Sequence, residues 1–160
     1  MKDNSIRKIL ARIYGTGRGA VFTPKDFLDI STSETVRQSL RRLAAAGTIR
    51  RLLRGIYDYP AFSTLFDAPA SPDPDAIARA IARTHGWTIL PASETALNAL
   101  GLSTQIPAHW RYFSDGPSKK YEWAGGKLVF THRPNKETTV LSPRTALLVQ
   151  ALKALGKTRV

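Results

Sequence analysis

The stretch that decides the fold runs from Thr23 to Pro60 and reads TPKDFLDISTSETVRQSLRRLAAAGTIRRLLRGIYDYP. Thr23 and Pro24 predict the start of a short helix, because threonine is a good N-cap and proline suits the first helical position. A second start signal follows at once, since Ser31 and Glu34 have the spacing of a capping box. Two helices joined by a tight turn are therefore predicted.

The second of these helices has one apolar side. Val36, Leu40 and Leu43 recur at a spacing that places them on a single face. Gly47 follows as the residue expected to end the helix in a left-handed conformation. We therefore expect this face to be buried and the opposite face to be open to a partner.

After the glycine, the pattern becomes extended. Residues 48–53 and 55–59 predict two strands around a tight turn at Arg54-Gly55. Upstream, residues 4–14 have helical periodicity, and residues 20–22 predict a short strand. The order is helix, strand, short helix, helix and hairpin, which predicts a winged helix-turn-helix domain over residues 1–62.

Such a domain reads DNA with the exposed face of its second helix and grips the backbone with its hairpin. Glutamine pairs with adenine and arginine with guanine, and short hydroxyl side chains at a helix N-terminus suit phosphate contacts. The predicted DNA-binding residues are Thr32, Ser33, Thr35, Arg37, Gln38, Arg41 and Arg42 in the helix and Arg50, Arg51 and Arg54 in the hairpin. The alternative for any one of these arginines is that it lies on a solvent-exposed face and contacts no DNA.

The composition agrees with a polyanionic partner. The 160 residues include 24 Lys and Arg against 12 Asp and Glu, a net charge of +12. An anionic membrane surface is the competing partner, but no basic amphipathic helix stands apart from a core pattern. The chain has no cysteine, which excludes disulfides and thiolate sites. Without an apolar span or signal peptide, a cytoplasmic location is expected.

The remainder of the chain predicts a linker at residues 63–75 and a smaller α+β domain with a mostly antiparallel sheet at residues 76–160. His85, His109 and His132 match no metal motif, and no phosphate-binding loop is present. We therefore expect no catalytic site, metal or cofactor. Of the hypotheses for the function, an enzyme that acts on nucleic acid is therefore the one that the sequence supports least.

Two segments resemble the AbiEi-type antitoxins of type IV toxin–antitoxin systems and their shorter regulator relatives. They are GAVFTPKDFLDISTSETVRQSLRRLAAAGTIRRLLRGIYDYP (19–60) and ILPASETALNALGLSTQIP (89–107). The second segment is followed by strands and by SPRTAL (142–147). The resemblance implies a repressor of its own operon that binds inverted repeats in its promoter, and a toxin encoded next door. It assigns the DNA-reading roles to Thr35, Gln38, Arg41, Arg42, Arg51 and Arg54.

The resemblance leaves several points open. The last helix stops near residues 156–160, whereas more helical sequence is expected beyond it, as in a truncated chain. Either cooperative monomers or a dimer would fit inverted repeats. The alternative function is a transcriptional regulator without a toxin partner, whose C-terminal domain senses a ligand or mediates oligomerisation.

Overall fold

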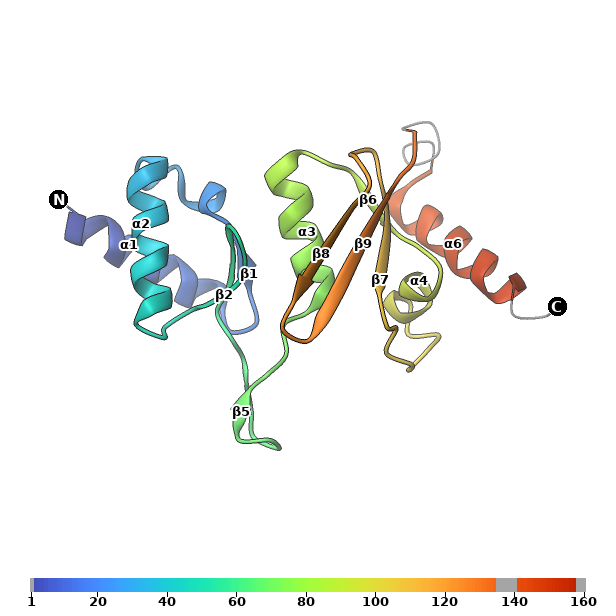
Figure 1. Ribbon diagram of the computed structural model, residues 1–160, viewed down its shortest axis with the longest axis horizontal. Helices are drawn as coiled ribbons and strands as arrows, with labels where there is room; N and C mark the ends of the chain where they lie inside the picture. Colours follow the sequence, from blue (N-terminus) through green and yellow to red (C-terminus); the bar gives the residue numbers. More distant parts are fainter. Residues whose placement is uncertain (1, 135–140, 158–160) are drawn as a thin grey trace. The chain divides into compact units, whose positions relative to one another are not determined.

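The chain forms two compact units, Met1–Thr84 and His85–Val160. A computed structural model describes residues 2–134 and 141–157 (Figure 1). Both units combine helices with sheets whose strand pairs are mostly antiparallel, so the predicted α+β class is confirmed. The division falls at the end of a helix, downstream of the predicted linker.

Unit 1 begins with the predicted succession of elements. These are α1 (Lys2–Thr16), β1 (Val21–Phe22), the 3-10 helix η1 (Pro24–Phe27), α2 (Ser33–Ala45), β2 (Arg50–Leu53) and β3 (Ile56–Asp58). The three strands form one antiparallel sheet in the order β1-β3-β2. The sheet places the last strand, β3, between the other two.

The core of unit 1 is built from the apolar faces of these elements. Val36 and Leu40 of α2 are fully buried, and Leu43 is nearly so, as their spacing predicts. They join Ile9 of α1 in one cluster with the aromatic side chains of the sheet and η1. Phe27 meets Phe22 edge to face with ring centroids 5.6 Å apart, a geometry that aromatic pairs favour.

The ends of α2 explain where this helix lies. Thr32, not Ser31, is the N-cap, and its hydroxyl oxygen accepts a bond from the Thr35 backbone N–H. At the other end Gly47 has φ +74°, and the N–H groups of Gly47 and Thr48 donate to the carbonyls of Ala44 and Leu43. This is the Schellman arrangement, which satisfies carbonyls that the helix itself leaves free.

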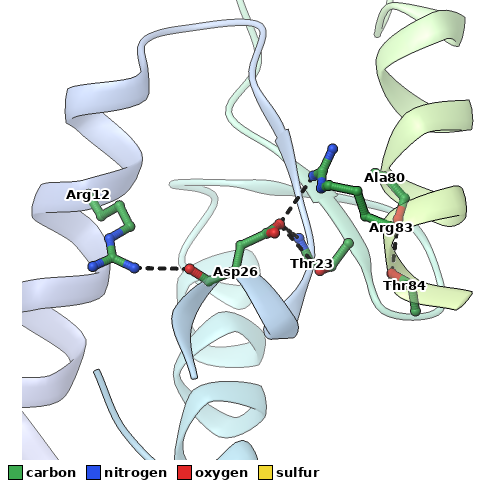
Figure 2. A network of polar contacts seen from close by, with 6 residues as sticks. All are labelled: Arg12, Thr23, Asp26, Ala80, Arg83 and Thr84. Carbon is green, nitrogen blue, oxygen red and sulfur yellow. Dashed lines mark hydrogen bonds and ion pairs between the residues drawn. The ribbon is translucent and has the colours of Figure 1, made fainter. Parts of the chain in front are cut away.

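A small antiparallel hairpin, β4 (Phe62–Ser63) and β5 (Ala68–Pro69), begins one residue before the predicted linker and lies otherwise within it. Helix α3 (Pro74–His85) follows the hairpin. Two bonds connect α3 to η1, one of which runs from Lys25 Nζ to the Thr84 carbonyl at 2.6 Å and the other from Arg83 to Asp26. The Arg83 guanidinium lies 3.3 Å from the Asp26 carboxylate, which also accepts the Thr23 backbone N–H at 2.8 Å (Figure 2). The Asp26 side chain therefore caps η1 and meets α3 at the same time.

The described residues of unit 2 form a four-stranded sheet and two helices. Its elements are β6 (Ile89–Pro91), α4 (Glu94–Ala99), β7 (Trp110–Ser114), β8 (Lys119–Trp123), β9 (Gly126–His132) and α6 (Pro143–Lys157). The strand order is β6-β7-β9-β8, and only the β7–β9 pair is parallel. The sequence also predicts a strand at residues 138–141, and these residues lie largely outside the described part of the chain.

Candidate nucleic-acid interface

The exposed face of α2 gathers four polar side chains. Glu34, Arg37, Gln38 and Arg41 follow one another at intervals of three, one and three residues, which keeps them on one side of the helix. All four are exposed, and together they line one hollow in the surface. The burial of Val36 and Leu40 on the other side fixes this orientation, because turning the helix would expose the core.

In the part of the chain that the structure describes, the exposed cations of α2 have no intramolecular counter-ion. Among the described residues, none forms an ion pair with Arg37, Arg41 or Arg42. Arg37 and Arg41 are four residues apart, and like charges at this spacing destabilise a helix by about 0.2–0.5 kcal/mol. An anion bound between them would offset that repulsion, so the face is suited to a polyanionic partner.

The hydroxyl residues at the start of α2 have different roles. The Thr32 hydroxyl donates to Thr35 Oγ1 at 3.0 Å while it accepts the backbone N–H of Thr35 at 3.4 Å. The capping interaction therefore occupies Thr32, which the sequence predicts as a DNA contact. Ser33 is exposed at the first position of the helix, where the positive end of the macrodipole attracts phosphate.

Arg50 has a structural role that the sequence did not reveal. Its guanidinium donates to both oxygens of Asp58, at 3.0 and 2.6 Å, and to the carbonyl of Ala70 at 3.0 Å. Asp58 is only 1% exposed, and a buried carboxylate is costly unless it is paired. We therefore leave Arg50 out of the candidate interface.

The other two hairpin arginines are exposed. Arg51 makes one weak contact with the carbonyl of Leu53, at 3.5 Å. Arg54 stands beside Gly55, whose φ of +78° allows the tight turn between β2 and β3. No described residue forms an ion pair with either guanidinium. Both side chains can thus reach a phosphate.

Two further arginines of unit 1 are held in internal contacts that sequence reasoning missed. Arg12 makes a bidentate pair with Asp29, with N–O distances of 2.7 and 2.6 Å, and this contact lowers the pKa of Asp29. The Arg18 guanidinium lies 4.7 Å from the ring centroid of Tyr59. Among the described residues of unit 1, α2 and the β2–β3 turn thus keep exposed arginines that form no ion pair.

The described part of unit 2 gathers no comparable cluster of polar side chains. His85 stacks on Trp87 with ring centroids 4.5 Å apart, and His132 Nδ1 lies 2.9 Å from the Gly116 carbonyl oxygen. In residues 2–134 and 141–157, no three His, Cys, Asp or Glu side chains are grouped to hold a metal ion. In the same part of the chain, no helix has the length and apolar character needed to span a membrane.

Comparison with protein families gives one match. A family of unknown function, DUF6088, matches residues 8–160. The chain belongs to this family. The DUF6088 match extends over both units. No curated protein matches the chain.

Proposed function

We propose that residues 1–62 are a winged helix-turn-helix domain that binds double-stranded DNA in a sequence-specific way. Three features support this proposal: the element order, the antiparallel sheet that ends in the β2–β3 hairpin, and the open polar face of α2. The last carries most weight. A helix that buries three aliphatic side chains and exposes unpaired arginines beside a glutamine can enter a major groove.

Each side chain has a role set by its chemistry. Gln38 and Arg41 present a bidentate amide and guanidinium, which suit adenine and guanine edges. Arg51 and Arg54 present guanidinium groups from the hairpin, which suit phosphates or the minor groove. Glu34 is compatible with this face, because a carboxylate accepts a bond from the cytosine amino group.

In its biological setting, we propose that this member of DUF6088 represses its own promoter in the cytoplasm and acts as the antitoxin of a toxin–antitoxin system. The support is the resemblance of residues 19–60 and 89–107 to AbiEi-type antitoxins. The proposed partners are inverted repeats in the promoter and a toxin from the same operon. A regulator without a toxin remains the alternative.

The DNA-binding proposal is tested by selecting bound duplexes from a random pool and then measuring affinity over a salt series. Gln38→Ala and Arg41→Ala should each cost about 1–3 kcal/mol of discrimination at one base position. Arg54→Ala should weaken binding to all sequences and reduce the salt slope by about one. Arg144→Ala, an exposed arginine of α6, is the matched control and should change neither.

The proposal fails if the full chain retains no duplex at low salt, or if Arg144→Ala weakens binding as much as Arg41→Ala does. The antitoxin role is tested separately by co-expression with the neighbouring reading frame. Rescue of growth by the chain supports that role. A neighbouring product that is harmless alone supports the alternative regulator.

A further inference from the structure

The β4–β5 hairpin carries two large apolar side chains at its tip. Leu65 is 83% exposed and Phe66 is 78% exposed. An isolated two-stranded hairpin is marginally stable in water, and exposed apolar side chains add nothing to its stability. This tip has the character of a surface that a partner covers.

The base of the hairpin is fixed, which makes the tip a preformed element. The Ala70 N–H donates to the Ala61 carbonyl at 2.7 Å and closes the base. The Arg50 guanidinium donates to the Ala70 carbonyl, and the Arg18 guanidinium to the Pro60 carbonyl at 3.1 Å. The residues that flank both strands are thus attached to unit 1 by charged donors, which lowers the entropy that the base of the hairpin loses on binding.

A hollow of about 410 Å³ lies beside this base. Its aromatic wall is formed by Tyr14 and Tyr59, whose ring centroids are 5.4 Å apart, and Tyr14 is half exposed. Arg18 adds a positive charge over Tyr59. The remaining lining comes from the hairpin base and from the loop after α2: Ala46, Gly47, Thr48, Pro60, Ala61, Phe62 and Pro69.

We propose that the hairpin tip of one copy of the chain occupies this hollow in a second copy, and the reverse. The hollow is lined by Phe62 and Pro69 at the base, whereas Leu65 and Phe66 lie at the other end of the same hairpin. Two hairpins packed antiparallel about a twofold axis place each tip over the base of the other. The same patch is used by both copies, as a closed dimer requires.

The chemistry of tip and hollow is complementary. Phe66 meets the two tyrosine rings, and aromatic pairs contribute about 0.5–1.5 kcal/mol beyond the area that they bury. Asp67, exposed beside Phe66, is opposite in charge to Arg18. Few large side chains take part, so the interface lies at the small end of the range, under about 1,200 Å², where association is weak. We therefore expect a dimer that dissociates in the micromolar range.

The absence of cysteine allows a direct test. Thr64→Cys and Ala46→Cys are made in separate full-length chains, so a disulfide between them joins two molecules; Thr64 is an exposed residue of the hairpin turn, and its replacement leaves Leu65 and Phe66 in place. Mixed under oxidised glutathione, they should form the heterodimer at least about tenfold faster than Thr64→Cys mixed with Lys8→Cys, an exposed position on α1. Equal rates in the two mixtures would overturn the proposal.

Sedimentation equilibrium at about 100 µM gives an independent measurement, because a micromolar dimer is populated there. The double variant Leu65→Ser with Phe66→Ser should be monomeric, and its melting temperature should equal that of the wild type when both are measured well below the dissociation constant. Leu152→Ser, 59% exposed on α6, is the matched control and should leave the dimer intact. A wild-type chain that stays monomeric, or a dimer lost only with Leu152→Ser, refutes the proposal. These outcomes need no DNA, so they are separate from those of the DNA-binding proposal.

Discussion

Replacing Arg50 by alanine should unfold unit 1 more easily without removing a DNA contact. In the folded chain, Asp58 lies almost fully buried at the end of β3, and the Arg50 guanidinium is its counter-ion. The substitution leaves the carboxylate in the sheet with no cation. It also removes the bond from Arg50 to Ala70, which holds the base of the β4–β5 hairpin.

The expected cost follows from burial on the two sides of the pair. Removing one partner of a buried ion pair costs about 3–5 kcal/mol. The Arg50 side chain is 33% exposed, so water screens it in part and a value near 2 kcal/mol is more appropriate. The lost bond to Ala70 adds about 1 kcal/mol. For a unit of this size, a loss of about 3 kcal/mol lowers the melting temperature by roughly 12–24 °C.

Circular dichroism melts and urea titrations of the full chain measure this effect. Arg51→Ala, the adjacent and exposed arginine, is the control and should change stability by no more than about 0.5 kcal/mol while weakening DNA binding. Arg50→Met combined with Asp58→Leu should recover most of the lost stability. If Arg50→Ala melts like the wild type and loses DNA affinity, the structural role given to Arg50 is wrong.

Three further substitutions test the packing of unit 1. Gly47→Ala forces alanine to φ +74° and should cost about 1–2 kcal/mol in urea titrations, whereas Gly15→Ala, with open space and no positive φ, should not. Asp29→Asn should destabilise the chain at neutral pH. Because Arg12 lowers the pKa of Asp29, the difference from wild type should shrink as pH falls below about 4. Leu40→Ala should cost about 2–5 kcal/mol by calorimetry, because Leu40 is fully buried.

Local sequence patterns predicted the elements of unit 1 well. The aliphatic spacing of Val36, Leu40 and Leu43 set the buried face of α2, and the glycine after the helix set its end. The four polar residues that line the hollow on α2 follow from the same periodicity. These features depend on residues within two helical turns of each other, so periodicity and capping rules are sufficient to find them.

The role of Arg50 depends on the register between β2 and β3, which no local sequence rule predicts. In a regular hairpin with Leu53 opposite Ile56, the residue opposite Asp58 would be Arg51. A β-bulge between Arg51 and Leu53 shifts the pairing by one residue, so Arg50 faces Asp58 instead. The bulge therefore decides which arginine pairs with Asp58 and which stays exposed.

Contacts between distant segments were also missed. The pairing of β4 with β5 sits in a stretch whose prolines predicted a linker, and the bonds that fix its base come from Arg18 and Arg50. In unit 2, a mostly antiparallel sheet was predicted, but the parallel pairing of β9 with β7 was not. Strand order in a sheet is set by tertiary packing, which residue spacing alone does not encode.

The central position of β9 has a consequence for synthesis on the ribosome. Strand β9 pairs with both β7 and β8, so the four-stranded sheet of unit 2 stays incomplete until His132 has been added. The three-stranded sheet of unit 1 has all its strands once Asp58 has been added. At about 5–20 residues per second, the first unit has several seconds in which to fold alone. Force-sensitive arrest peptides placed at successive chain lengths should therefore report two separate folding events, and a single late event would show that the units fold together.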